Sequence, residues 1–327
     1  MTKKMSKVSI IDHLFDKCKI KYSYDNNLDN ESQIISSSHC TMLEGVDFDL
    51  TFNPLTHLGY KSVIKSLGPL YAKEFTPIFS SIIISIPTKL SLSNIEELWT
   101  GISKAFEDHS VDSVNLDLQP SNNILSISIT TQGKQEKERF VQKPKCVSGD
   151  LICVSSSLGA AYIGAQILHR EKRVFLESNI QPKLDNYKDI LRFYLSPTID
   201  KELFNILKKT DLSCSYGVFN RDGLADSIKL ICNNNSLGAK IFANRIPIAQ
   251  YTSQVAQELN LDPLTAAFNG GEDYNFIFTF PLSQSQRVIK ELPQLDIIGH
   301  TCDIDSGVKL ISPDGSELEL KAQAWDY

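Results

Sequence analysis

The chain has 327 residues, of which 42% are apolar and 22% charged, and its formal net charge is −6. This composition excludes a disordered tail, a collagen-like fibre and a small disulfide scaffold, and the length suits about two domains of roughly 150 residues. A mildly acidic chain also argues against nucleic-acid binding and against a polybasic membrane surface, because both need a basic footprint.

Strand and helix signals alternate in the first third of the chain. The first forty residues are polar and predict loop with at most one short strand, whereas alternation over 43–52 predicts a strand. The β-branched run 80–87 predicts a buried strand that ends at a proline. Ser93 lies three residues before Glu96, which is the spacing of a capping box, and predicts the start of a helix. The apolar stripe of this helix comprises Ile95, Leu98, Trp99, Ile102, Ala105 and Phe106.

A charged segment separates the two halves of the chain. Alternation at 125–129 predicts a half-exposed strand, and the charged residues 132–145 after it lack periodicity. We interpret this segment as a surface connection between an N-terminal domain, 1–142, and a C-terminal domain, 143–327. An ordinary exposed hairpin is the alternative interpretation.

The second half repeats the alternation of strands and helices. Strands are predicted at 151–155, from Ile241, around Phe276, Phe278 and Phe280, at 296–300 and at 308–311, and helices at 158–170 and 224–232. The pattern predicts an α/β or α+β protein with two layers in each of two domains.

The seven cysteines are spread along the chain without a C-x-x-C pair. An odd number with wide spacing favours reduced thiols in a cytoplasm over a disulfide framework or a zinc site. The segment 1–12 has no apolar core of a secretory signal, and no run of about 18 apolar residues occurs. We therefore expect a cytoplasmic protein without a membrane span.

Several short strings contain residue types that suit an anion or metal site. NGGEDY at 269–274 combines glycines, which permit close approach to a ligand, with two adjacent carboxylates. RDGL at 221–224 places a carboxylate where it could hold a cation beside a phosphate, and SSSLGAA at 155–161 suits a helix N-terminus near an anion. Each string alone also fits a simpler structure, namely a tight turn or a capped helix.

Taken in order, the strings resemble thiamine-monophosphate kinases, which share a superfamily with aminoimidazole ribonucleotide synthetase and selenophosphate synthetase. The resemblance runs from about Leu43 to the C-terminus and rests on LEGVDFDLTFNPLTHLGYKS (43–62), LYAKEFTP (70–77), SLGAAYIGAQILHREK (157–172), NGGEDYNFIFT (269–279) and LELKAQAWDY (318–327). It implies a two-domain synthetase-like fold that forms a homodimer through its N-terminal sheet, with ATP and several Mg²⁺ ions between the domains. The reaction of the family transfers the γ-phosphate of ATP to thiamine monophosphate and yields thiamine diphosphate.

The same resemblance assigns roles to individual residues. It implies metal binding by Asp25, Asp117 and Asp222, nucleotide binding by Trp99, Asp117, Lys143 and Arg221, and substrate binding by Asp47, Glu272 and Trp325.

Other positions depart from the family pattern. Metal-binding aspartates of the family fall on Cys40, Pro69 and Phe219, and a serine falls on Arg221. Neither Pro nor Phe offers a ligand atom to magnesium. The departures predict a degenerate family member that is weak or inactive as a kinase and still binds a nucleotide, a thiamine-like ligand or a partner protein.

Two other interpretations stay open. In the first, the chain is an active kinase whose metal ligands come from Glu44, Asp47 or Asp49, with Lys65 and Arg221 replacing part of the metal charge. In the second, it is a related enzyme that acts on another phosphate.

Overall fold

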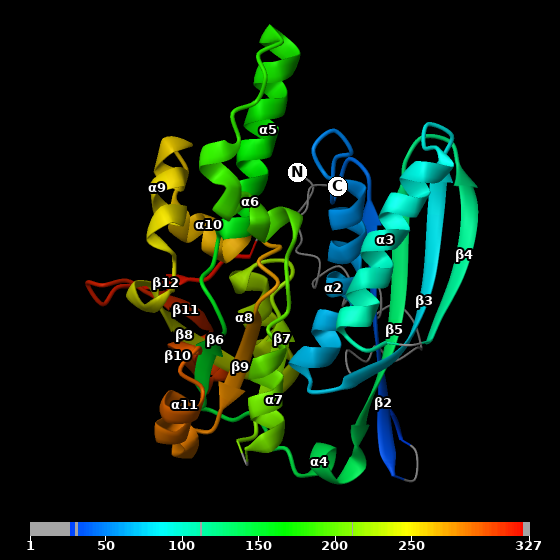
Figure 1. Cartoon of the computed structure of the whole chain (residues 1–327). Coiled ribbons are helices and arrows are strands. Elements are labelled where there is room, and N and C mark those ends of the chain that lie inside the picture. Colours follow the sequence, from blue (N-terminus) through cyan, green and yellow to red (C-terminus); the bar gives the residue numbers. More distant parts are fainter. Residues whose placement is uncertain (1–26, 30–31, 112, 211, 323–327) are drawn as a thin grey trace, which may run out of the picture.

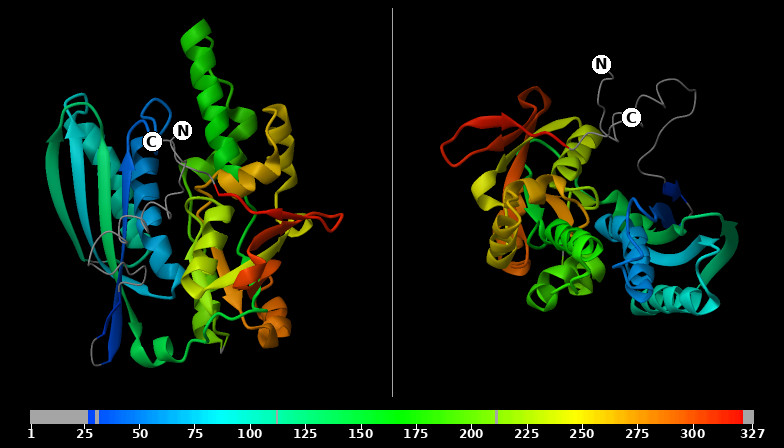
Figure 2. Two further views of the ribbon diagram at one scale, coloured as in Figure 1. Left: turned by 180° about the vertical axis from the view of Figure 1, so that it is seen from behind. Right: turned by 90° about the horizontal axis from the view of Figure 1, so that it is seen from above.

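The computed structural model describes residues 27–29, 32–111, 113–210 and 212–322. Within these ranges the chain forms one sheet of five strands and one of seven, in two halves that lie side by side (Figures 1 and 2). The order of the first sheet is β1-β2-β5-β3-β4, and that of the second is β12-β11-β8-β10-β6-β9-β7. The combination of strands and helices in both halves confirms the predicted α/β (α+β) class.

The first sheet comes from the N-terminal half of the chain. Its strands are β1 (Asn27–Asp29), β2 (Gln33–Leu43), β3 (Thr76–Pro87), β4 (Ser113–Ser121) and β5 (Ser126–Glu136). Alternate residues of β2 and β5 are buried, and α2 (Leu55–Ala72) packs against both strands. Helix α3 (Leu92–Asp108) packs against α2, so the two helices cover one face of this sheet.

Glycines let α2 and α3 approach closely. A Cβ atom on Gly59 would lie 2.1 Å from the carbonyl oxygen of Leu98, and one on Gly101 would lie 1.8 Å from the carbonyl oxygen of Thr56. A larger side chain at either position would force the helices apart. This crossing holds α2 in place and thereby positions the residues that α2 contributes to the site described below.

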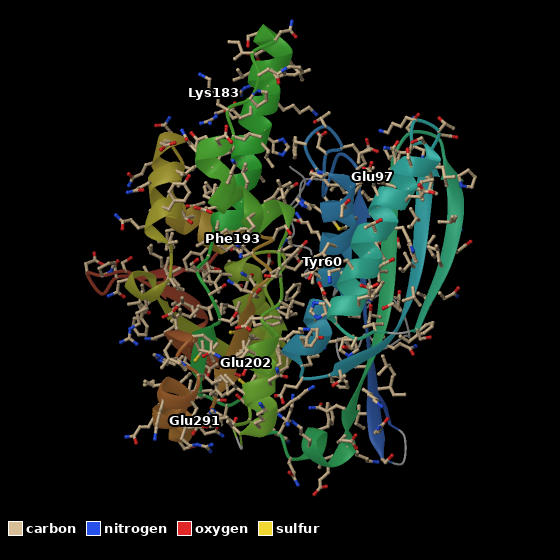
Figure 3. All side chains as sticks on the ribbon, in the orientation of Figure 1. Tyr60, Glu97, Lys183, Phe193, Glu202 and Glu291 are labelled. Atoms are coloured by element: carbon tan, nitrogen blue, oxygen red, sulfur yellow. The ribbon has the colours of Figure 1, made fainter. Side chains whose placement is uncertain are left out.

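The second sheet and its helices come from the C-terminal half. The strands are β6 (Leu151–Val154), β7 (Tyr216–Phe219), β8 (Leu237–Phe242), β9 (Phe276–Phe280), β10 (Asp296–Asp303), β11 (Val308–Ile311) and β12 (Glu317–Glu319). The helices are α5 (Ala160–Ser178), α6 (Lys188–Leu195), α7 (Lys201–Lys209), α8 (Leu224–Asn235), α9 (Gln250–Glu258), α10 (Pro263–Asn269) and α11 (Ser285–Glu291). Helix α5 projects beyond the body of this half, with Lys183 near the outer end of the projection (Figures 1 and 3).

Helix α2 also connects the two halves. A Cβ atom on Gly217 of β7 would lie 1.9 Å from the carbonyl oxygen of Ala72, so the end of α2 rests directly on the second sheet. One cluster of buried apolar side chains runs from Met42 in β2 to Phe276 and Phe278 in β9. The halves therefore share part of their hydrophobic core.

The strand predicted at 43–52 is wrong, because the strand lies earlier, at Gln33–Leu43, and a turn follows it. The inward positions of β2 include Ser36 and Ser38, both buried. The hydroxyl of Ser38 donates to the carbonyl oxygen of Ser66 on α2, which satisfies a polar group inside the core. Since these inward residues are serines, the apolar alternation that marks a half-buried strand is missing from the sequence.

Three further predictions need correction. The helix predicted to begin at Ser93 is capped by Ser91, whose side chain accepts from the backbone N–H of Asn94 in a capping box. The segment 132–145 is not purely a connection, since β5 continues to Glu136 and α4 (Lys137–Val141) follows. The strand expected from Ile241 ends there instead, because β8 spans Leu237–Phe242. The domain boundary after residue 142 stays a prediction.

The other predicted segments lie close to observed elements, whereas the sequence patterns did not predict α2, β4, α6, α7, β7, α9, α10 and α11. None of the helices in the described ranges is long and apolar enough to cross a membrane. The six cysteines that the structure describes are free thiols, as predicted, and five of them are buried.

Candidate functional site

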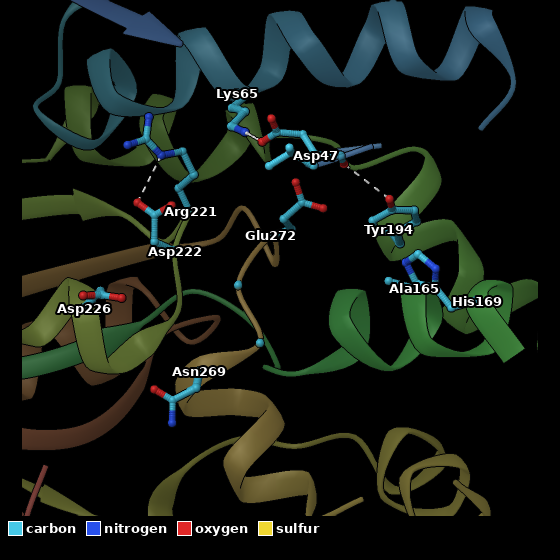
Figure 4. Close-up of a pocket in the computed structure, with 13 residues that line it drawn as sticks. Asp47, Lys65, Ala165, His169, Tyr194, Arg221, Asp222, Asp226, Asn269 and Glu272 are labelled. Atoms are coloured by element: carbon cyan, nitrogen blue, oxygen red, sulfur yellow. Dashed lines mark hydrogen bonds and ion pairs between the residues drawn. The ribbon is translucent and has the colours of Figure 1, made fainter. Parts of the chain in front are cut away.

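A cavity of about 300 Å³ lies between the two halves of the chain (Figure 4). The N-terminal half contributes the turn after β2 and the middle of α2, and the C-terminal half contributes α5, α6, the start of α8 and the segment after α10. Its charged lining residues are Asp47, Lys65, Arg221, Asp222, Asp226 and Glu272. The structure therefore brings together four of the predicted site residues, namely Asp47, Arg221, Asp222 and Glu272.

The NGGEDY segment directs its two carboxylates to different places. Gly271 has a φ of +71°, and a Cβ atom there would lie 3.1 Å from the carbonyl oxygen of Arg221. The same oxygen accepts a hydrogen bond from the backbone N–H of Glu272 at 2.8 Å. Glu272 lines the cavity, whereas Asp273 accepts hydrogen bonds from the backbone N–H groups of Gly159 and Ala161 at the start of α5. The helix N-terminus predicted near an anion thus has the chain's own carboxylate as its anion.

Desolvation raises the pKa of the Asp273 carboxyl to about 7, although its two backbone N–H partners oppose this effect. Asp273 therefore fixes the start of α5, whereas Glu272 faces the cavity.

Glu272 is paired with a deeply buried lysine. The Nζ atom of Lys61 lies 2.8 Å from Oε2 of Glu272 and 3.7 Å from the ring centroid of Tyr194. Lys61 is only 1% exposed, and burial lowers its pKa while the charge of Glu272 opposes that shift. The hydroxyl of Tyr274 donates to Oε1 of Glu272 at 3.2 Å, so both carboxylate oxygens have partners.

Two other cavity acids also have basic partners. Nζ of Lys65 lies 2.6 Å from Oδ1 of Asp47, whose Oδ2 accepts from the backbone N–H of Leu43 at 2.9 Å. Nε of Arg221 lies 3.3 Å from Oδ2 of Asp222. Figure 4 shows these pairs together on the cavity wall. Their charges are therefore largely compensated by the protein itself.

Cys40, Pro69 and Phe219 stand where the resemblance expects three metal aspartates, and both Cys40 and Phe219 belong to the apolar cluster that the halves share. The Phe219 ring stacks on Tyr274 with centroids 5.3 Å apart. The Sγ atom of Cys40 lies 3.6 Å from the carbonyl oxygen of Ser62, and burial raises the pKa of this thiol to about 11. Pro69 lies within α2, next to Gly68, which packs closely against the ring of Phe219.

This donor set does not fit a magnesium site. In the ranges that the structure describes, no three His, Cys, Asp or Glu side chains gather closely enough to hold a metal ion. Magnesium prefers several oxygen ligands in octahedral geometry, and three of the four cavity acids, Asp47, Asp222 and Glu272, already form ion pairs with lysine or arginine.

Other predicted site residues lie elsewhere. Among the described residues, Asp117, Trp99 and Lys143 are not part of the cavity lining. Asp117 is exposed on β4, Trp99 packs against the core from α3, and Lys143 forms an ion pair with Glu74 at 3.1 Å. Asp25 and Trp325 fall outside the described residues. The roles that the resemblance gives to these five residues stay predictions.

The structure adds residues in the cavity wall or directly behind it that the sequence did not single out. Lys61 lies within the LGYKS string, but nothing local reveals that it pairs with Glu272, 211 positions away. Tyr194 belongs to no motif and reaches the cavity through the packing of α6. Asp226 lies in the first turn of α8, directly after the RDGL string, and its nearness to that string could have indicated it.

Comparison with solved structures defines the class of fold. The structure titled AaThiL complexed with AMPPCP and TMP superimposes with a TM-score of 0.81 at 19% identity and covers 99% of both chains. A crystal structure of the HypE–HypF complex gives a TM-score of 0.68 at 13% identity, over 96% of this chain and 99% of that chain. The chain therefore has the two-domain synthetase-like fold that thiamine-monophosphate kinase and HypE share.

Comparison with curated sequences specifies the relationship. The thiamine-monophosphate kinase of Buchnera aphidicola from Acyrthosiphon pisum is 27% identical over 285 residues, which cover 86% of this chain and 83% of the relative. That of Nitrosopumilus maritimus is 24% identical over 331 residues and 99% of both chains. No family model matches the sequence. The chain is thus related to thiamine-monophosphate kinases, which confirms the resemblance predicted from its motifs.

Proposed function

We propose that this protein is a degenerate relative of thiamine-monophosphate kinases, with a ligand-binding cavity but weak or no kinase activity. The observation that carries the proposal is the pairing of cavity acids with the protein's own cations. Asp47, Asp222 and Glu272 lie beside Lys65, Arg221 and Lys61, respectively. In the proposed protein, these cations occupy the electrostatic role that magnesium has in the family.

The chemistry of phosphoryl transfer explains why this exchange weakens a kinase. Two phosphate groups must approach each other, and metal ions both offset their repulsion and orient the reacting oxygens. A lysine or arginine supplies charge but cannot bridge two phosphates with fixed octahedral geometry. Cys40, Pro69 and Phe219 offer no carboxylate at the three positions where the resemblance expects metal ligands.

The main alternative is an active kinase with relocated metal ligands. The relocated candidates Glu44 and Asp49 each pair with a lysine, Lys89 and Lys172. Oε2 of Glu44 also accepts from the backbone N–H of Leu125 at 2.9 Å. These contacts favour the degenerate interpretation, since recruiting either acid to a metal would break an existing ion pair.

A homodimer formed through the first sheet belongs to the same proposal. Ile83 on β3 is 43% exposed and lies on the face of the first sheet opposite the buried Ile82 and Ile84, where a second copy could cover it. Sedimentation velocity of the purified protein tests the dimer, which Ile83→Lys should weaken. We further propose a cytoplasmic protein that is able to bind ATP or thiamine monophosphate, as its solved relative titled with AMPPCP and TMP does.

A kinase assay tests the proposal that the protein has weak or no thiamine-monophosphate kinase activity. The purified chain is incubated with ATP, Mg²⁺ and thiamine monophosphate, and thiamine diphosphate is quantified beside the Aquifex aeolicus kinase as a positive control. We expect no product above the protein-free blank. Product at a rate comparable with the control would support the active-kinase alternative. Parallel reactions with other phosphate monoesters as acceptors test the related-enzyme alternative.

A further inference from the structure

Two basic side chains of the cavity wall come from opposite halves of the molecule. Lys65 lies on α2, and Arg221 lies between β7 and α8. The side chains are only 9% and 26% exposed, and both charges act on the buried thiol of Cys40 between them. Because the surroundings are poorly hydrated, a hydrogen bond from either cation to an anion is stronger than it would be in water.

The partners of these cations are exchangeable. Asp222 is 45% exposed in its side chain and Asp47 is 21% exposed, so water can hydrate either carboxylate once its cation moves to another acceptor. Lys61 differs, since it is buried beneath Glu272 and the ring of Tyr194. Lys65 and Arg221 are therefore the cations that a ligand can recruit.

We propose that Lys65 and Arg221 together hold the phosphate group of a phosphate monoester directly, without magnesium. This inference rests on the proposed function and specifies the ligand class of the same cavity. Arginine presents a fork of N–H donors that matches two phosphate oxygens, and lysine adds a compact charge on a third. In this arrangement Asp47 and Asp222 are the resting partners that the phosphate displaces.

Charge balance limits the ligand to one phosphate group. With His169 counted as neutral, the described lining and Lys61 behind it comprise four carboxylates and three cations, which leaves one formal negative charge. A monophosphate that contacts two cations is tolerated, whereas a triphosphate would place further negative charge beside Asp226 and Glu272. The cavity should therefore bind a monophosphate more tightly than ATP in the absence of metal.

Calorimetry of the full chain tests this inference with three probes, inorganic phosphate, thiamine monophosphate and ATP, each in EDTA and in MgCl₂. We expect thiamine monophosphate to bind in EDTA, to bind equally well in MgCl₂, and to compete with inorganic phosphate. Arg221→Gln and Lys65→Gln should each weaken binding at least about tenfold, the typical loss for a charge-assisted hydrogen bond. Arg173→Gln removes the same charge from an exposed position on α5 and should leave the affinity unchanged.

Three results would overturn the inference: binding only in the presence of Mg²⁺, no binding of either monophosphate, or wild-type affinity in Arg221→Gln. If Lys65→Gln does not fold, as circular dichroism would show, the Arg221→Gln variant still decides, because Arg221 is less buried than Lys65. The calorimetry and the kinase assay test different claims, so either claim can fail without the other. Turnover with Mg²⁺ would refute the degenerate kinase alone, and loss of metal-free binding in an inactive protein would refute this inference alone.

Discussion

Gly68 and Phe219 are in direct contact where the two halves of the molecule meet. A Cβ atom on Gly68 would lie 2.4 Å from the ring of Phe219, so only a glycine lets α2 approach the end of β7. Phe219 stands at a position where the resemblance expects a metal aspartate, and Pro69 stands at another. The residue at one of these positions, Phe219, thus packs closely against α2 where the halves meet.

Gly68→Ala should destabilise the protein by about 1–3 kcal/mol, the usual cost of overpacking a close contact. The added methyl group would push the Phe219 ring away from Tyr274. Urea denaturation followed by circular dichroism measures the loss. In a Phe219→Leu background the same alanine should cost markedly less, because the smaller side chain leaves room. An equal loss of stability in both backgrounds would show that the contact with Phe219 does not cause the destabilisation by Gly68→Ala.

Lys61→Met should lower stability by about 2 kcal/mol, because it leaves the partly exposed Glu272 carboxylate without its cation. The double variant Lys61→Met/Glu272→Gln should recover part of this loss, since no uncompensated charge remains. Thermal unfolding of the four proteins in this cycle gives the coupling between the two residues. Strict additivity would contradict a direct interaction.

Glu74 anchors the connection between the halves. Its carboxylate lies 2.7 Å from Arg139 and 3.1 Å from Lys143 and accepts from the thiol of Cys214 at 3.0 Å. Glu74→Gln should cost about 3 kcal/mol, because two cations lose a buried partner. Glu138→Gln, on the exposed side of α4, is the matched control and should cost little.

Lys143 gives a related prediction about a residue that the resemblance assigns to nucleotide binding. Since its Nζ atom contacts Glu74 and the carbonyl oxygen of Lys73, Lys143→Met should lower the melting temperature and leave ATP affinity unchanged. An unchanged melting temperature with weaker ATP binding would instead support the role in nucleotide binding.

His109 should make stability depend on pH in the acidic range. Burial, together with the nearby charge of Lys201, lowers the pKa of this histidine from 6.5 to about 4. Between these values the unfolded chain binds a proton that the folded protein does not, so stability falls as the pH decreases from 6.5 towards 4.

With allowance for partial solvation, the His109 contribution is about 2 kcal/mol. The free energy of unfolding of wild type and of His109→Gln, measured between pH 4 and 6.5, separates the contribution of His109 from that of other titrating groups. The stability difference between the two proteins should shift in favour of the variant as the pH falls. Parallel pH profiles would contradict the prediction.

Local sequence patterns predicted several strands and helices and part of the site, but not α2, which carries Lys61 and Lys65. The apolar stripe around Leu98 and Ile102 predicted α3, and the NGGEDY and RDGL strings identified Glu272, Arg221 and Asp222. Strand β2 was missed because its inward residues include serines that bond to α2.

The pairing of Lys61 with Glu272 was also beyond local patterns. That contact joins residues from the two halves and depends on the close packing of α2 against the second sheet. Local sequence determines how each single helix or strand forms. Which charged side chains meet at the cavity depends on how the helices and strands pack, and only the tertiary structure shows this.

The most direct test of the central claim is a titration of the protein with Mn²⁺, a paramagnetic substitute for Mg²⁺, followed by electron paramagnetic resonance with and without ATP. We expect the signal of free Mn²⁺ to stay the same as in a matched protein-free solution, because Asp47, Asp222 and Glu272 already form ion pairs with lysine or arginine. Saturable stoichiometric binding that Asp222→Asn abolishes would contradict it.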